Sequence, residues 1–116
     1  DEDGFFFITG RKKELIIKGG ENISPREIDD TLYKHNAVLE ACTFGIVDDN
    51  YGEEISACVF LKENLKANEK ELKDLCTTDL GEYKTPSQII FVDEPLPKGP
   101  SGKIQRLKIA SLYNRA

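Results

Sequence analysis

The stretch VLEACTFGIVDDNYGEEISACVFL, residues 38–61, decides the fold, because it places two apolar, β-prone runs on either side of a short polar segment. The runs cover residues 38–47 and 55–61. The intervening DDNYG, residues 48–52, is rich in Asp, Asn and Gly, which favour tight turns. Two strands connected in this way predict an antiparallel hairpin.

Upstream of this hairpin, a helix start is unusually well marked. Ser24 is an N-cap candidate, Pro25 suits the first helical position, and Glu27 stands where it would close a capping box. We therefore expect a helix over residues 25–34. Before it, residues 5–8 and 15–17 are short β-prone runs, and the paired glycines that follow indicate a loop.

Downstream, Asn68 and Glu71 form a second capping pair and predict a helix that ends near Gly81. Residues 88–92 indicate a strand, and residues 105–114 a last helix. Between these two, several prolines and glycines predict an extended, non-helical loop.

The expected element order is β-β-α-β-β-α-β-α, and a chain of 116 residues suits one domain. This order predicts an α+β fold: a small mixed domain with an N-terminal two-stranded hairpin and a three-stranded sheet packed against helices.

Composition excludes several function classes. With 16 Lys and Arg against 21 Asp and Glu, the chain has a net charge of −5 and lacks the basic footprint of a general nucleic-acid binder. No apolar run approaches the ~20 residues of a transmembrane segment. The 3 cysteines form no C-x-x-C pair, which argues against a zinc site or a disulfide framework and favours a cytoplasmic protein. The absence of methionine suggests a fragment of a longer protein.

Two glycine-rich, basic segments are candidates for chemistry: GRKKELIIKGGEN, residues 10–22, and PKGPSGK, residues 97–103. Each alone is a weak signal, and the second lacks the spacing of a Walker A loop. A basic residue on a mobile loop is nevertheless suited to neutralising charge that develops on a phosphate.

Longer versions of both segments carry a family resemblance. GRKKELIIKGGENISPREID, residues 10–29, resembles the hinge-and-loop motif of the adenylate-forming superfamily, and PKGPSGKIQR, residues 97–106, resembles its C-terminal lysine motif. The whole chain, residues 1–116, is thereby identified as similar to the mobile C-terminal domain of an acyl-CoA synthetase. The resemblance implies a hinge near residues 10–14 and a large N-terminal domain outside this chain.

The resemblance implies a two-step ligase. A carboxylic acid would react with ATP, normally with Mg²⁺, to give an acyl-adenylate and pyrophosphate, and coenzyme A would then take the acyl group. ATP and Mg²⁺ would be bound mainly by the large N-terminal domain, the expected partner of this one. The chain alone should therefore be inactive.

Carried over by position, Lys103 would be the adenylation lysine, and Ser101 and Gly102 would let its loop approach closely. Arg11 would contact the nucleotide, and Lys13 would be the hinge residue. The alternative for Arg11 and Lys13 is that they are ordinary solvated charges.

Gly19 and Gly20 match glycines that line the tunnel for the coenzyme A arm, and Glu21 and Asn22 follow them in that loop. Here a side chain would block the thiol. The alternative is a tight turn that leads into the helix.

Two competing functions remain open. One is the adenylation domain of a peptide synthetase, which acts on a carrier protein. The other is a non-catalytic α+β interaction module.

Overall fold

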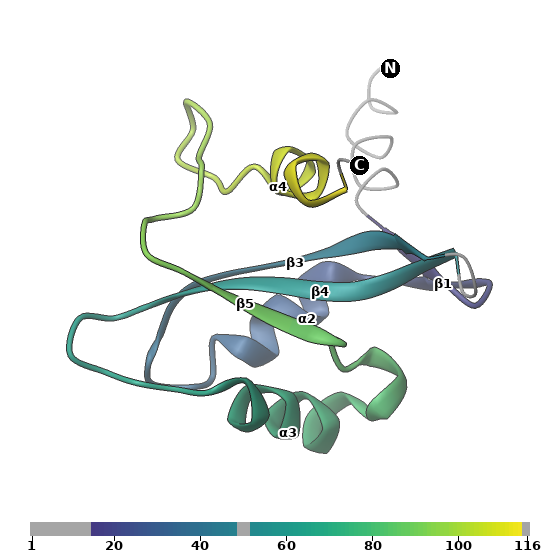
Figure 1. The fold of residues 1–116 in the computed structure, drawn as a ribbon, viewed down its shortest axis with the longest axis horizontal. Coiled ribbons are helices and arrows are strands. Elements are labelled where there is room, and N and C mark those ends of the chain that lie inside the picture. Colours follow the sequence, from purple (N-terminus) through teal and green to yellow (C-terminus); the bar gives the residue numbers. More distant parts are fainter. Residues whose placement is uncertain (1–14, 49–51, 115–116) are drawn as a thin grey trace.

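The computed structural model describes residues 15–48 and 52–114, and its framework is a five-stranded sheet (Figure 1). Strand β4 (Gly52–Leu61) is central. On one side it pairs antiparallel with β3 (Val38–Asp48), and on the other it pairs in parallel with β5 (Gln88–Val92). Strand β1 (Ile16–Lys18) meets the start of β4 and pairs antiparallel with β2 (Glu21–Ile23).

Helices cover both faces of this sheet. Helices α2 (Pro25–Leu32) and α3 (Glu69–Leu80) lie on one face, and α4 (Arg106–Tyr113) lies on the other (Figure 1). A short 3₁₀ helix, η1 (Glu82–Lys84), connects α3 to β5. The α+β class predicted from the element order is confirmed, and the sheet is mixed because β5 runs parallel to β4.

Each face of the sheet has its own apolar core. The larger cluster lies under α2 and α3 and includes Ile28, Leu32, Ile55 and Leu72. The smaller one lies under α4 and includes Phe44 and Ile109. The cysteines are free and buried, as expected for small core residues (Cys42, Cys58, Cys76).

The local sequence signals located most elements well. The central hairpin, both predicted helices on its flanks and the strand at residues 88–92 are all confirmed. One difference is at Glu21–Ile23, which forms strand β2 although the sequence indicated a loop. It does so because Ile23 is 1% exposed and pairs with Ile16, so the hairpin buries an apolar residue from each strand. The expected strand at residues 5–8 lies outside the described residues.

The two predicted capping boxes have different outcomes. At α3, the Asn68 side chain accepts a hydrogen bond from the Glu71 N–H, and the Glu71 carboxylate accepts one from the Asn68 N–H. At α2, Ser24 makes no side-chain cap, so that prediction is wrong. Glu27 pairs instead with Lys84 of η1 at 2.9 Å, which ties α2 to the segment after α3.

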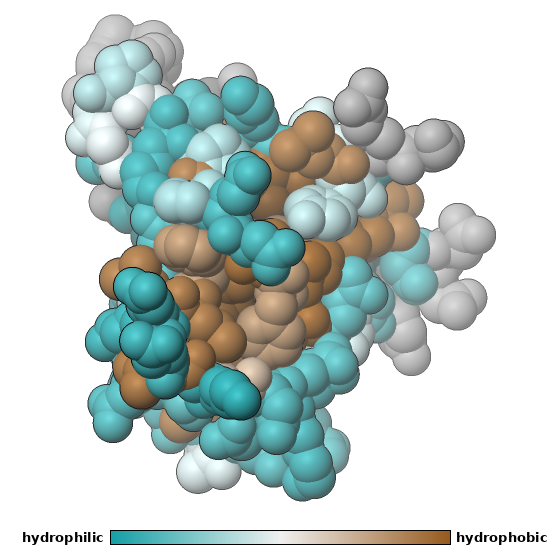
Figure 2. Space-filling model, turned by 60° about the vertical axis from the view of Figure 1, so that its left-hand side comes forward, coloured by the Kyte–Doolittle hydropathy of each residue, from teal (hydrophilic) through white to brown (hydrophobic). Residues whose placement is uncertain are grey.

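Apolar side chains also remain on the surface. Figure 2 shows them gathered in a band across one face, with hydrophilic surface above and below. Of the described helices, none is long and apolar enough to cross a membrane.

Candidate functional site

Residues 97–105, called here the lysine loop, form a closed turn that presents Lys103 to solvent. The Gly99 N–H donates to the Lys103 carbonyl at 3.0 Å, and the Gln105 N–H donates to the Pro97 carbonyl at 2.9 Å. A β-bridge between Lys98 and Ile104 joins the two sides. The loop is non-helical, as expected, but it is closed by its own hydrogen bonds rather than extended.

Gly102 is required by the backbone of this loop. Its φ is +84°, a conformation that residues with a Cβ rarely adopt. Space is not the reason for the glycine, because a Cβ built on it would meet no atom of the described residues within 4 Å. The Gly102 N–H donates to the Gly99 carbonyl at 2.9 Å and so closes the turn that precedes it. Ser101 and Lys103, on either side of it, are exposed.

The first side of the lysine loop is anchored by Glu40 of β3. One oxygen of the Glu40 carboxylate accepts a hydrogen bond from the Leu96 N–H at 2.8 Å, and the other pairs with the Lys98 ammonium group. Lys98 also donates to the Leu96 carbonyl at 3.1 Å. One carboxylate thus holds the chain where it enters the loop.

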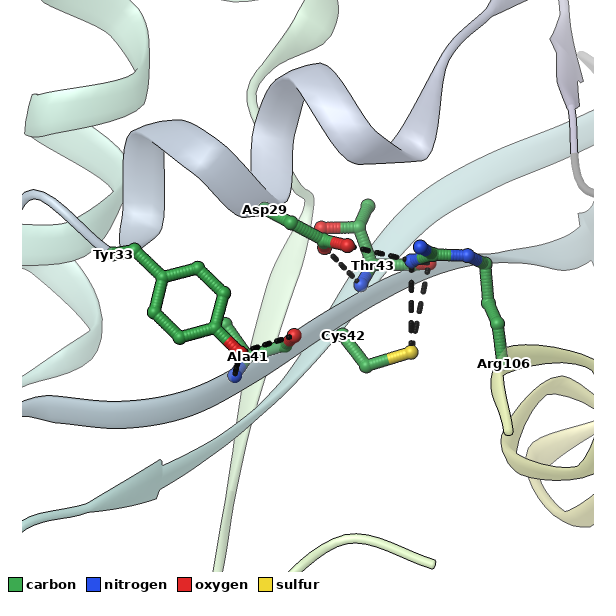
Figure 3. Close-up of polar contacts among 6 residues, drawn as sticks. All are labelled: Asp29, Tyr33, Ala41, Cys42, Thr43 and Arg106. Carbon is green, nitrogen blue, oxygen red and sulfur yellow. Dashed lines mark hydrogen bonds and ion pairs between the residues drawn. The ribbon is translucent and has the colours of Figure 1, made fainter. Parts of the chain in front are cut away.

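The second side is anchored by a largely buried ion pair between Arg106 and Asp29 (Figure 3). Arg106 Nη1 donates to Asp29 Oδ2 at 2.8 Å and to the Thr43 carbonyl at 2.9 Å, and it lies 3.6 Å from Cys42 Sγ. Asp29 Oδ1 accepts from the Thr43 N–H at 2.7 Å. The pair therefore connects the start of α4 with both α2 and β3.

Burial raises the pKa of the Asp29 carboxyl, and the positive charge of Arg106 and hydrogen bonds from Arg106 and Thr43 offset part of that rise. Next to this cluster, Tyr33 Oη accepts a hydrogen bond from the Ala41 N–H at 3.1 Å (Figure 3). This cluster was not predicted from the sequence. A signal was present in Asp29, an acid that directly follows Ile28 on the apolar side of the expected helix.

An open hollow of about 960 Å³ lies between the lysine loop and the α2–β3 side of the domain. Its walls carry charges of both signs, with Arg26 and Lys103 among the cations and Asp30 among the acids. A polar, open hollow of this kind suits contact with another polar surface better than enclosure of an apolar acyl chain.

Residues 18–21, called here the glycine turn, connect β1 to β2. Gly19 has φ +57° and Gly20 has φ +86°, so both central residues have the positive φ that a type I′ hairpin turn requires. A Cβ on Gly19 would lie 2.4 Å from Tyr83 Oη, whereas a Cβ on Gly20 would meet nothing within 4 Å. Among the described residues, a steric contact therefore explains the missing side chain at Gly19 but not at Gly20.

Tyr83 of η1 holds the first half of this turn. Its hydroxyl donates to the Lys18 carbonyl, and Lys18 Nζ donates back to the Tyr83 carbonyl at 2.9 Å. The same ammonium group lies 4.5 Å from the centre of the Tyr83 ring and 3.5 Å from Glu54 Oε1. Glu21 and Asn22 follow in β2 with exposed side chains.

The structure does not bring all the predicted site residues together. The lysine loop and the glycine turn lie at opposite ends of the sheet (Figure 1), so one orientation of the domain cannot present both to the same point. Arg11, Lys13 and the hinge expected near residues 10–14 lie outside the described residues. Within residues 15–48 and 52–114, no group of three or more His, Cys, Asp or Glu side chains could hold a metal ion.

Comparison with known proteins gives a consistent result. The sequence profile of the family described as AMP-binding enzyme C-terminal domain matches residues 27–103, more than half of the chain. The chain is 54% identical over 109 residues to a sulfoacetate–CoA ligase from Cupriavidus necator, covering 94% of this chain and 21% of that protein. It is 47% identical over 109 residues to a mitochondrial medium-chain acyl-CoA ligase from Rattus norvegicus, covering 94% of this chain and 18% of that protein.

Solved structures agree with this result. An acyl-CoA synthetase from Brucella canis superposes with a TM-score of 0.80 at 36% identity, covering 89% of this chain and 19% of that one. An amide bond synthetase from Marinactinospora thermotolerans gives a TM-score of 0.80 at 26% identity, covering 86% and 20%. The chain thus spans about a fifth of the length of the proteins it matches.

Proposed function

Because this chain belongs to the AMP-binding enzyme C-terminal domain family, we propose that it is the C-terminal domain of an ATP-dependent acyl-CoA synthetase. The single observation that carries the proposal is the lysine loop, which presents the exposed Lys103 from a closed turn anchored on both sides. A large N-terminal domain would complete the enzyme and would bind ATP, Mg²⁺ and the carboxylic acid.

In the first half-reaction, a carboxylate oxygen attacks the α-phosphorus of ATP, and the bond to pyrophosphate breaks. The product is an acyl-adenylate. Negative charge builds up on the oxygens around phosphorus in this step, and Lys103 Nζ is assigned to donate hydrogen bonds to them. In this assignment Arg11 contacts the nucleotide, and Ser101 and Gly102 allow the loop to come close.

In the second half-reaction, the thiol of coenzyme A attacks the acyl carbon, loses its proton, and displaces AMP. Gly19 and Gly20, with Glu21 and Asn22 after them, are assigned to the passage for the thiol arm. The opposite placement of the two loops supports a change of domain orientation between the steps (Figure 1). We assign that change to the hinge near residues 10–14, with Lys13 as the hinge residue.

The two alternative functions differ from this proposal: one uses another acceptor for the acyl group, and the other involves no catalysis. The named CoA ligases among the relatives favour coenzyme A over the carrier protein of a peptide synthetase. The amide bond synthetase neighbour illustrates that the fold alone does not fix the acceptor. A non-catalytic module would not account for a lysine loop held by two ion pairs.

The buried free cysteines suit a reducing compartment, and we propose that the protein is located in the cytoplasm.

The decisive experiment measures both half-reactions in the full-length protein that contains this domain. Carboxylate-dependent ATP–pyrophosphate exchange over a panel of acids should detect the first step. Lys103→Ala should lower its rate about 100- to 1,000-fold, as expected for loss of one donor to the developing charge. Thioester formation from preformed acyl-adenylate should remain.

Lys108→Ala, which changes an exposed lysine in α4, is the matched control and should leave both steps intact. If no acid in the panel supports exchange in the wild-type protein, the proposed function is wrong. Equal loss of both steps in Lys103→Ala would remove Lys103 from its assigned role.

A further inference from the structure

The Asp29–Arg106 pair lies where it can control the lysine loop rather than the overall fold. Arg106 is three residues after Lys103 and is the first residue of α4. Its partners, Asp29 in α2 and Thr43 in β3, belong to elements that are already packed together in the apolar core. The pair therefore fixes the end of the loop to a framework that does not need the pair.

The geometry of Arg106 leaves its guanidinium group little freedom. One nitrogen, Nη1, donates to both Asp29 Oδ2 and the Thr43 carbonyl, while the other Asp29 oxygen is held by the Thr43 N–H. The two side chains are only 12% and 11% exposed, so water competes weakly for these contacts.

Both sides of the lysine loop are attached to the same strand. Glu40 holds the first side and Thr43, with Asp29, holds the second. These two β3 residues are roughly 10 Å apart along a strand that rises about 3.3 Å per residue. The base of the loop is thus clamped at two separated points, which sets the direction in which Lys103 projects.

Burying an ion pair is an inefficient way to gain stability, because removing two charges from water costs about as much as their attraction returns. An apolar pair of similar volume would avoid the cost of burying two charges, although it would leave the Thr43 N–H and carbonyl without these partners. An apolar pair would not, however, fix the orientation of the loop, because apolar contacts are non-directional.

We propose that Asp29 and Arg106 are positioning residues for adenylation, which hold the lysine loop so that Lys103 reaches the reacting phosphate in the correct orientation. This inference rests on the proposed function and adds to it two residues that never touch substrate.

The test uses the double variant Asp29→Leu/Arg106→Met in the full-length protein, which replaces the charges by apolar groups. Carboxylate-dependent exchange should fall about 100-fold, the effect of misplacing a catalytic group by about 1 Å. Thioester formation from preformed acyl-adenylate should stay within about twofold of wild type. Amide exchange over residues 97–105 should become faster than exchange over the core strands, and the variant should remain folded at the assay temperature.

Glu27→Leu/Lys84→Met is the matched control, because it removes an exposed ion pair of the same helix that does not touch the lysine loop. It should leave both half-reactions unchanged. The more conservative Arg106→Lys keeps the charge but loses the planar donor group, so it should show the same selective loss at smaller size. It carries the test if the apolar double variant fails to fold.

The inference is overturned if Arg106→Lys slows both half-reactions equally, or if the folded double variant keeps full exchange activity. Either result would leave the proposed function standing as long as Lys103→Ala loses exchange. Absence of exchange in the wild-type protein would instead reject the proposed function itself.

Discussion

The glycine turn and the lysine loop lie at opposite ends of one sheet, and the protein holds them by different means. The glycine turn is an extension of the sheet: its strands pair in register, its backbone needs glycine at both central positions, and Tyr83 covers one of them. The lysine loop is a closed turn outside the sheet, attached to β3 by Glu40 and to α2 and β3 by Arg106.

This difference indicates which property matters in each region. In the glycine turn, the requirement is for the absence of a side chain. In the lysine loop, the requirement is for one charged group in a fixed place. The glycine turn should be sensitive to added side-chain volume, and the lysine loop to loss of the ion pairs that hold it. Substitutions of these two kinds should therefore affect the two regions differently.

Outside the lysine loop, the largest expected effect comes from Gly20→Leu. A Cβ at this position would meet no atom of the described residues within 4 Å, so we expect the steric effect to come from what the turn faces in the enzyme. Thioester formation from preformed acyl-adenylate should fall about 100-fold, while pyrophosphate release in the first step stays within about threefold.

The matched control for this substitution is Gly81→Leu. Gly81 has a similar φ of +94° and open space around it, but it follows α3 and belongs to neither loop. Its ψ of 164° places it in a region that residues with a Cβ avoid, so this variant should also carry backbone strain and yet leave both half-reactions intact. Unimpaired thioester formation in Gly20→Leu would remove Gly20 from the proposed passage.

A second prediction separates the two glycines by stability. Gly19→Ala should lower the free energy of unfolding by about 2–3 kcal/mol, since it combines backbone strain with a clash against Tyr83 Oη. Gly20→Ala should cost only about 1 kcal/mol, from strain alone. Denaturant titration of both variants, with and without Tyr83→Phe, provides the check. When Tyr83→Phe is also present, Gly19→Ala should cost no more than Gly20→Ala, and a cost that stays unchanged would exclude the clash.

A third prediction concerns α3, which belongs to neither region. Hydrogen bonds to the Ile89 N–H and to Lys73 lower the pKa of Glu69, and the Asn68 N–H and His35 lower that of Glu71. A lowered folded pKa means that these groups stabilise the fold above their ordinary value of 4.5, and that this contribution is lost as pH falls through the folded value.

Between about pH 7 and about pH 3.5, the thermal midpoint of the wild type should therefore drop further than that of Glu69→Gln, which has already lost the contribution. Thermal unfolding followed by circular dichroism measures both drops. Glu63→Gln, in an exposed position before α3, is the control and should follow the wild type. Equal drops in the thermal midpoint of the wild type and of Glu69→Gln would refute the stabilising role of the Glu69 carboxylate.

The smallest effect is expected at Cys76. Burial raises the pKa of this thiol to about 11, with a further contribution from Asp79, so the reactive thiolate is scarce near pH 8. Alkylation by iodoacetamide should therefore occur only through unfolding. Its rate should be the same in the wild type and in Lys103→Ala, and faster labelling in Lys103→Ala would mean that the lysine loop influences the core under α3.

The sequence predicted well those features that depend on neighbouring residues. Pro25 marks the start of α2, and the Asn68–Glu71 box marks the start of α3, because capping requires only a few consecutive residues. The positions of the lysine loop and the glycine turn were also found, because each is a continuous motif.

Features that depend on distant residues were not found. The parallel pairing of β5 with β4, the contact of Tyr83 with Gly19, and the pairing of Asp29 with Arg106 all join segments far apart in the sequence. Ser24 has the correct local spacing for a cap, yet Glu27 is engaged by Lys84. A local pattern offers an interaction, and a tertiary partner decides whether it forms.

The two-point attachment of the lysine loop has a mechanical consequence. If the lysine loop cannot flex on its own, the Lys103 ammonium group moves only when the entire domain moves. Any error in the final orientation of the domain then displaces Lys103 Nζ, because the loop does not absorb it. The position of the ammonium group relative to phosphorus would then be set by the surfaces on which the domain docks, and these surfaces are remote from the nucleotide.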